Sequence, residues 1–405
     1  MVERVTGNQA TGGAARRGMG FILLVALANA GGVIAFLPLL SLLLPVRIAE
    51  IAGEARIGLF TATVITGAVA ASLSNIAFGW ASDRTRARGR GRRSWVVIGL
   101  VLLALSFAAV AVARSPAAII LAIILFQVAV NALLAPLFAI MADEVPGAQM
   151  GLAGGLIALG SPLASAVGAV MIALALPGDG AQLAFILAMV LLCVVPLLRV
   201  PSVEAAAIAS TTPPRLAGRD LAVAWLSRLL VQIAGNVLSL YLVYYFVSID
   251  PDLSVAKQVG PIGQLMTIAY LLPLPAAVLL GRWSDRIGRR KPFLLAAALL
   301  AALGLLGLAV ARDWTTAACA FALYAMGSSV FLSIHSGFAM QLLPSAARRG
   351  RDLGLINLTN TLPALIGPAL AWALSTPRDF GPVMLLLAAL TLIGGALVLG
   401  IRQQR

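Results

Sequence analysis

The chain contains 405 residues, of which 61% are hydrophobic and 11% are charged, and its formal net charge is +14. A soluble domain is usually about 45–50% apolar and about a quarter charged, so a water-soluble core of this length could not bury so much apolar surface. The positive charge would indicate nucleic-acid binding in a soluble protein, but here the basic residues separate long apolar runs, which is typical of a multi-pass membrane protein.

Apolar runs long enough to cross a bilayer as helices recur along the whole chain. In the first part they predict transmembrane helices at 19–44, 58–81, 95–113, 116–141, 150–176 and 181–198. In the second part they predict helices at 220–247, 259–280, 292–311, 314–343, 353–375 and 380–401. The stretch 95–141 is expected to be a hairpin, because Arg114-Ser115-Pro116 interrupts it and proline cannot continue a helix.

The distribution of basic residues predicts the orientation of these helices. With the N-terminus inside, 22 of the 29 Lys and Arg residues fall in inner segments and six in outer segments. Cytoplasmic loops carry such an excess, so we expect both tails, 1–18 and 402–405, to lie in the cytoplasm. The membrane is expected to be a bacterial inner membrane. Residues 1–18 show no cleavable signal, so the first helix is expected to remain in the protein.

An internal repeat divides the chain into two predicted bundles, 19–198 and 220–401, joined by a cytoplasmic linker at 199–219. Gly79-Trp80-Ala81-Ser82-Asp83-Arg84 after the second span matches Gly281-Arg282-Trp283-Ser284-Asp285-Arg286 after the eighth. A pair of arginines follows each copy, and Pro146 and Pro344 occupy matching places further on. Parallel six-helix repeats occur in transporters, where the solute binds between the halves near the membrane midplane.

The repeated segment resembles the signature between the second and third helices of the major facilitator superfamily, and the resemblance covers residues 19–401. A closer likeness is to sucrose transporters and glycoside–cation symporters within that superfamily. It rests on Arg90-Gly91-Arg92-Arg93-Ser94-Trp95, Gly288-Arg289-Arg290-Lys291-Pro292-Phe293, Ala142-Asp143-Glu144-Val145-Pro146 and Asn360-Thr361-Leu362-Pro363. The resemblance implies an all-α integral membrane fold of twelve helices in two pseudo-symmetric bundles.

The same resemblance implies that Asp83 and Asp285 brace a cytoplasmic gate by meeting arginines and helix N-termini. A carboxylate at such a helix end accepts charge-assisted hydrogen bonds, and these must break when the cytoplasmic side opens. The competing interpretation is that these charges only set the orientation of the helices in the membrane. The candidate gate residues are Asp83, Arg84, Arg92, Arg93, Asp143, Asp285, Arg286, Arg289 and Arg290.

Ionisable residues inside spans are costly and therefore mark candidate functional sites. Arg228 and His335 lie well inside predicted spans at similar depth. Arg228 begins a polar stripe with Gln232 and Asn236, which follow at helical i, i+4 spacing, and Ser239 continues it. Both residues could contact the solute. Alternatively, the long side chain of Arg228 reaches toward the cytoplasmic headgroups, and His335 only packs between helices.

Further candidate solute-binding residues are amides in other spans, which could hydrogen-bond a polyhydroxylated solute or join helices to one another. They are Asn29, Gln127, Asn131, Gln264, Asn357 and Asn360, together with Tyr270. The tyrosines at 241, 244 and 245 are interpreted as cavity walls or as an aromatic belt at the membrane interface, and the belt is favoured for at least one of them.

These features favour a transporter over an enzyme. One histidine, two cysteines inside apolar runs and no deep acid supply neither a nucleophile–base pair nor a metal site, and no cofactor is expected. No phosphate-binding loop supports ATP-driven transport. The prediction is a monomeric alternating-access transporter for a small polar solute, with a sugar or glycoside favoured. The alternatives are an organic-anion transporter using Arg228 and His335, and a drug exporter. The absence of a deep carboxylate leaves facilitated diffusion open beside coupling to a proton or cation.

Overall fold

The computed structural model describes residues 17–88, 91–146, 149–201, 218–250, 254–341, 359 and 361–402. Over these residues the protein is helical, with an isolated bridge between Thr376 and Asp379. Ten helical stretches of the described chain are long and apolar enough to cross a membrane. The predicted all-α membrane fold is therefore confirmed.

The N-terminal half (residues 17–201) begins with an interrupted helix. It is built from α1 (Met19–Pro38), the π-helical segment η1 (Leu39–Leu43), α2 (Leu44–Ala52) and the 3₁₀ turn η2 (Gly53–Ala55). The following helices are α3 (Arg56–Ala87), α4 (Arg93–Val112), α5 (Pro116–Glu144), α6 (Met150–Ile157), α7 (Gly160–Ala173) and α8 (Gly178–Leu198). Gly53 has a φ of 54°, which separates the first predicted span from the second.

The C-terminal half (residues 218–402) repeats this plan. Its helices are α9 (Gly218–Ile249), α10 (Val255–Leu271), α11 (Pro273–Ile287), α12 (Lys291–Val310), α13 (Trp314–Gln341), α15 (Pro363–Leu374) and α16 (Gly381–Leu397), followed by η5 (Val398–Gly400). The predicted eighth span is broken between α10 and α11, because Pro273 cannot donate a backbone hydrogen bond. Of the predicted eleventh span, the described part is α15 with Thr359 and residues 361 and 362.

Local sequence signals fix several helix ends. The hydroxyl of Ser115 accepts a hydrogen bond from the N–H of Ala118, and Pro116 begins α5, so the predicted hairpin between α4 and α5 is confirmed. Asp313 precedes α13 in the same way and accepts from the N–H of Thr316 at 2.9 Å. Hydrogen bonds from Thr316 hold the pKa of the exposed Asp313 carboxyl below its usual value.

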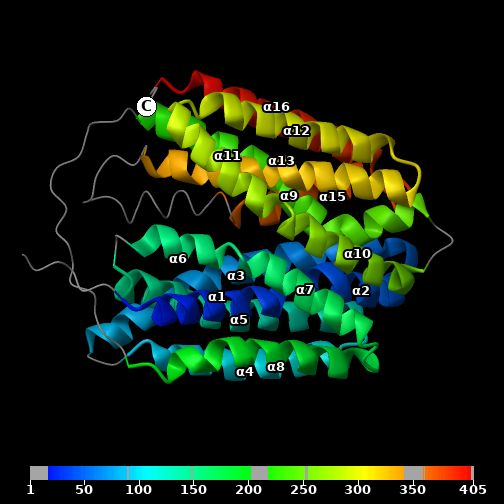
Figure 1. Ribbon diagram of the computed structural model, residues 1–405. Helices are drawn as coiled ribbons and strands as arrows, with labels where there is room; N and C mark the ends of the chain where they lie inside the picture. The colour runs from blue at the N-terminus through cyan, green and yellow to red at the C-terminus, as the bar shows by residue number, and fades with distance from the viewer. Residues whose placement is uncertain are drawn as a thin grey trace, which may run out of the picture.

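Figure 1 shows the two halves as separate bundles whose helices run side by side, with α1 to α8 in the lower bundle and α9 to α16 in the upper one. We call the end that carries residues 82–93 and 281–291 the basic end, and the opposite end the far end. The C-terminus lies at the basic end, where the Lys291 ammonium donates to the carbonyl of Ile401.

Close helix packing within each half depends on glycine. A Cβ placed on Gly99 of α4 would lie 2.6 Å from the backbone nitrogen of Leu133 in α5, so the two backbones are in direct contact. We expect Gly99→Ala to lower the free energy of unfolding by about 1–3 kcal/mol, because the backbones must separate. Gly79→Ala in α3 is the control, since a Cβ there meets nothing within 4 Å. Thermal unfolding in detergent measures both, and equal midpoints would contradict the predicted close packing.

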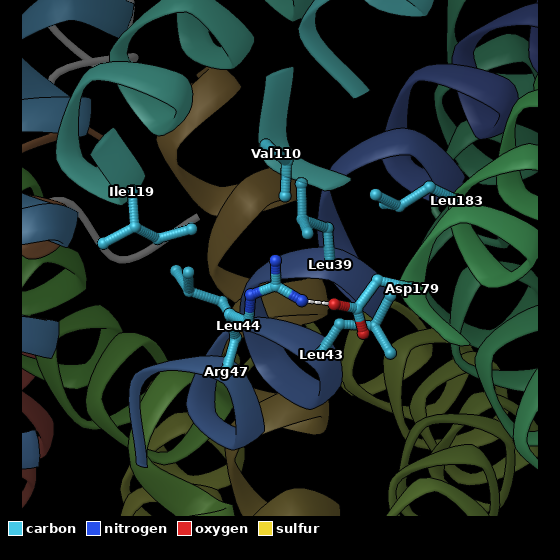
Figure 2. Close-up of a pocket in the computed structure, with 8 residues that line it drawn as sticks. All are labelled: Leu39, Leu43, Leu44, Arg47, Val110, Ile119, Asp179 and Leu183. Carbon is cyan, nitrogen blue, oxygen red and sulfur yellow. Dashed lines mark ion pairs between the residues drawn. The ribbon is translucent and has the colours of Figure 1, made fainter. Parts of the chain in front are cut away.

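Arg47, one of the few basic residues at the far end, is held by helix ends rather than by solvent. Its guanidinium donates to the carbonyls of Ala111 (3.1 Å) and Ala113 (2.7 Å) at the end of α4 and pairs with Asp179 at the start of α8. Figure 2 shows this pair at an apolar pocket lined by Leu39, Leu43, Leu44, Val110, Ile119 and Leu183. Arg47 thus satisfies carbonyls that α4 leaves without helical partners.

Candidate functional site

Polar contacts between the two halves occur at the far end. Thr61 bonds Tyr241 (2.6 Å), Tyr244 donates to the carbonyl of Pro45 (2.9 Å), Thr267 donates to Ser165 (3.2 Å), and Arg56 donates to the carbonyl of Pro377 (3.4 Å). The first two are buried, so they are shielded from competition by water. These contacts close the molecule at the far end.

The tyrosines of α9 form the centre of this closure. Phe60 of α3 meets the rings of Tyr241 and Tyr244 edge to face, with centroids 5.0 and 5.3 Å apart. Tyr245 lies beside them but donates to the carbonyl of Leu308 in its own half at 2.7 Å. All three tyrosines are buried, so the membrane-interface belt that was favoured for at least one of them is wrong. Sequence alone does not distinguish an interface between bundles from an interface with lipid.

The halves separate toward the basic end, as one face of α3 demonstrates. Gly58 lies near Trp372 of α15, and a Cβ there would be 3.8 Å from the indole nitrogen. Ile76 and Trp80 follow on the same helical face toward the basic end, and they are 72% and 62% exposed. The face that packs on the C-terminal half at the far end is therefore uncovered at the basic end.

The contact between α7 and α10 shows the same divergence. Ser165 and Thr267 are hydrogen bonded across the halves. One turn closer to the basic end on each helix, Ser161 and Leu271 are exposed. The facing surfaces of α7 and α10 are thus in contact at Ser165 and Thr267 and exposed one turn closer to the basic end.

Two predicted amides, Gln127 and Asn131, lie on the α5 face toward α3 and are partly exposed. Asn131 donates to the carbonyl of Gln127 (2.8 Å) and accepts from the amide of Asn75 in α3 (3.1 Å). Phe138, further along the same face, is exposed, so the face continues into the open side. Asn75 was not among the predicted candidates, because its partner is 56 residues away and no local spacing reveals it.

Other predicted amides differ in accessibility. Asn29 is buried in α1, donates to the carbonyl of Val25 and leaves its Oδ1 without a hydrogen-bond partner among the described residues. Gln264 of α10 is exposed. Tyr270 of α10 is hydrogen bonded to Ser239, the last member of the polar stripe in α9. This group therefore holds one buried and one accessible amide.

The polar stripe of α9 faces α15 within the same half. Gln232 donates to the carbonyl of Thr359 at 3.2 Å. A Cβ on Gly367 would lie 2.8 Å from Oδ1 of Asn236, so this amide is directed at the backbone of α15. Asn236 Oδ1 is buried and accepts no hydrogen bond from a described residue. The stripe thus lies at a helix–helix seam beside the open surface.

Arg228 and His335 are brought together by α9 and α13. His335 is completely buried, stacks on Phe331 with centroids 5.4 Å apart, and lies close enough to Arg228 and the backbone of Ala224 to interact with both. Arg228 is half-buried. Asn357, Asn360 and the side chain of Asp285 lie outside the described residues.

The candidate gate residues of the N-terminal half form an ion network across α3, α4 and α5. Arg92 contacts Asp83 at 2.6 Å and Asp143 at 2.7 Å, and it donates to the hydroxyl of Ser82 at 2.8 Å. Arg86 contacts the second oxygen of Asp143 at 2.7 Å. Asp83 therefore meets an arginine of its own half in this conformation, and its carboxylate is largely exposed.

A third carboxylate, Glu144, was not among the predicted gate residues. Its oxygens contact Arg93 and Arg17, each at 2.8 Å, and its side chain is 6% exposed. Arg17 also exchanges two hydrogen bonds of 2.9 Å with Gln149 through its backbone. The sequence signal that could have identified it is the Asp143-Glu144 pair at the end of a span. Such a pair is usually interpreted as a solvated helix end, so it did not indicate a buried ion pair.

The remaining gate candidates are exposed or partly exposed. Arg84 places its guanidinium 5.0 Å from the ring centre of Trp80. In the C-terminal half, Arg286 and Arg289 are exposed and Arg290 is half-buried.

Two helical bundles that meet at one end and separate at the other are an arrangement found in transporters built from repeated halves. A sequence profile of the Major Facilitator Superfamily matches residues 19–250 and 221–404, and the chain belongs to this family of transporters. It is a multi-pass membrane protein that transports small solutes and is not an enzyme.

Solved transporter structures share the fold at low sequence identity. The nucleoside transporter NupG has a TM-score of 0.68 at 15% identity and covers 96% of this chain and 100% of its own. A D-xylose–proton symporter has a TM-score of 0.68 at 16% identity, with coverages of 95% and 97%. The human organic anion transporter MFSD10 (TETRAN) has a TM-score of 0.66 at 16% identity, with coverages of 93% and 98%. A comparison with curated protein sequences found no significant match.

Proposed function

We propose that the protein moves a small neutral, polyhydroxylated solute of the sugar or glycoside type by alternating access. The observation that carries this proposal is the partly exposed amide pair Asn75–Asn131, with Gln264 exposed on the opposing half. Carboxamides both donate and accept hydrogen bonds, so they complement hydroxyl groups without a net charge. The loop segments that resemble sucrose transporters and glycoside–cation symporters support the same solute class, and nucleosides and xylose share a hydroxylated sugar ring.

The opening at the basic end corresponds to an inward-facing state in this proposal. Positive-inside asymmetry orients the basic end toward the cytoplasm, in a bacterial inner membrane. Each described Asp and Glu side chain lies near a helix end or in a connecting segment. Facilitated diffusion therefore needs no further group, whereas proton coupling would rest on His335 or Asp143.

The test is solute binding by the purified protein, measured as the rise in thermal midpoint with D-xylose, methyl glucosides, uridine and organic anions. We expect a neutral sugar or glycoside to stabilise the protein. Asn131→Ala should weaken that binding about 10-fold, because one or two hydrogen bonds of about 0.5–1.5 kcal/mol are lost. Gln182→Ala is the control, since Gln182 contacts the carbonyl of Leu176 at the far end. Equal loss in both variants would overturn the assignment of the amide pair.

An organic anion is the second candidate, because the half-buried Arg228 lies close to the buried His335. Arg228→Ala distinguishes the two candidates. Stabilisation by anions alone, abolished in this variant, would replace the sugar assignment with an anion site. Stabilisation by sugars that survives in this variant would leave Arg228 with a role in helix packing.

A further inference from the structure

One face of α11 at the basic end is exposed along its length. Leu279, Arg282, Trp283, Arg286 and Ile287 recur at helical i, i+3, i+4 spacing, and all are exposed. Together with Arg289, just beyond the helix, we call these residues the basic-aromatic face. Trp283 is held edge to face by Phe293 of α12, with centroids 5.4 Å apart. An ordered indole on this face is therefore available to a partner outside the protein.

In the equivalent segment of the N-terminal half, Arg86, Arg92 and Arg93 are paired with acids. Arg92 is paired with Asp83 and Asp143, and Arg93 with Glu144. These pairs absorb the charge of the arginines within the half itself.

Two of these acids, Asp143 and Glu144, have no counterpart in the C-terminal repeat. Counted from the matching prolines at 146 and 344, Asp143 and Glu144 are replaced by Gln341 and Leu342. Among the described residues no ion pair is made by Arg282, Arg286 or Arg289. The segment from Arg282 to Lys291 carries five basic residues and one acid, Asp285.

The order of side chains along the face matches the depth profile of a membrane leaflet. Leu279 lies within the apolar span, Trp283 one turn closer to the basic end, and Arg286 about 10 Å beyond Leu279 at 1.5 Å per residue. Leucine suits acyl chains, tryptophan suits the interface, and arginine reaches the phosphates, whose oxygens its planar guanidinium can bind in pairs.

We propose that the basic-aromatic face binds anionic phospholipid headgroups, such as phosphatidylglycerol, in the leaflet at the basic end. Lipid phosphates would then serve as counter-charges for the guanidinium groups of Arg282, Arg286 and Arg289, which pair with no described acid. Affinity is expected to depend on the net charge of the lipid headgroup. Three cations without described counter-ions are stabilised more by an anionic headgroup than by a zwitterionic one. This site is independent of the transported solute.

The experiment measures lipid binding to the purified full-length chain by native mass spectrometry, with thermal stability in parallel. Phosphatidylglycerol is expected to bind and stabilise the protein more strongly than phosphatidylcholine at the same mole fraction. Replacing Arg282, Arg286 and Arg289 with glutamine should reduce the apparent affinity for phosphatidylglycerol by on the order of 100-fold. If the glutamine variant fails to fold, replacement of all three by lysine, which keeps the charge, should retain the preference for phosphatidylglycerol. Loss of that preference in the lysine variant would overturn a charge-based site.

A matched control removes the same number of charges from the far end. The substitutions are Arg114→Gln, Arg312→Gln and Arg378→Gln, all at exposed positions. This control should keep the preference for phosphatidylglycerol. Equal loss in both triple variants would overturn the proposal in favour of a nonspecific charge effect. If inorganic phosphate raised the thermal midpoint as much as phosphatidylglycerol does, the lipid proposal would be overturned in favour of a site for soluble anions.

Discussion

Replacing both Tyr241 and Tyr244 with phenylalanine is expected to shift the protein toward a state that opens at the far end. The two hydroxyls make buried hydrogen bonds across the halves, to Thr61 and to the carbonyl of Pro45. Each bond contributes about 0.5–1.5 kcal/mol. Losing both should change the ratio of the two conformations by about 5- to 150-fold, since this range corresponds to about 1–3 kcal/mol.

Phenylalanine keeps the rings, so packing against Phe60 is retained and the effect is confined to the hydroxyls. Tyr245→Phe is the matched control, because its hydroxyl bonds Leu308 within the same half. The control should lose a hydrogen bond without changing the balance between conformations.

The measurement is the distance between spin labels at two exposed far-end positions, Glu54 in the N-terminal half and Arg312 in the C-terminal half. Both native cysteines are replaced beforehand. The double tyrosine variant should populate longer distances, and the Tyr245→Phe control should not. A matching shift in the control would mean that the variants loosen the fold generally and that the tyrosines do not latch the halves.

Features encoded within one helix length were predictable from the sequence. The spans followed from apolar run length, and the break before Pro116 followed from proline chemistry. The family followed from a motif that occurs twice at equivalent places. Each of these signals is read from short stretches of the sequence, so no knowledge of tertiary contacts was needed.

Features that depend on which helices meet were not predictable. The i, i+4 spacing places Gln232 and Asn236 on one face of α9, but it does not reveal that this face meets α15. No spacing of polar residues around Asn75 marks it as a candidate, because its hydrogen-bond partner, Asn131, lies in another helix. Tyrosine is a residue type common at membrane interfaces, yet Tyr241 is buried between the halves. In lipid, apolar surroundings are found both inside and outside the protein, so hydrophobicity alone does not specify the direction of a side chain.

Glu144→Gln is expected to cause the largest loss of stability among the substitutions considered. Glutamine keeps the shape of the side chain but removes the charge that Arg93 and Arg17 share. The arginines are themselves only 16% and 18% exposed, so little water replaces the missing carboxylate. Removing one partner from a buried ion network costs about 3 kcal/mol, because the remaining charges stay desolvated. The thermal midpoint in detergent should fall by several degrees.

Glu54→Gln is the matched control, because Glu54 is 83% exposed and its nearest cation, Arg56, is 3.9 Å away. An exposed pair of this kind contributes less than about 1 kcal/mol, so the midpoint should hardly change. A double-mutant cycle then assigns the loss to the network itself: Arg93→Gln combined with Glu144→Gln should cost less than the sum of the two single changes. Strict additivity would mean that Glu144 and Arg93 act separately, and that α4 and α5 are held together at the basic end by packing alone.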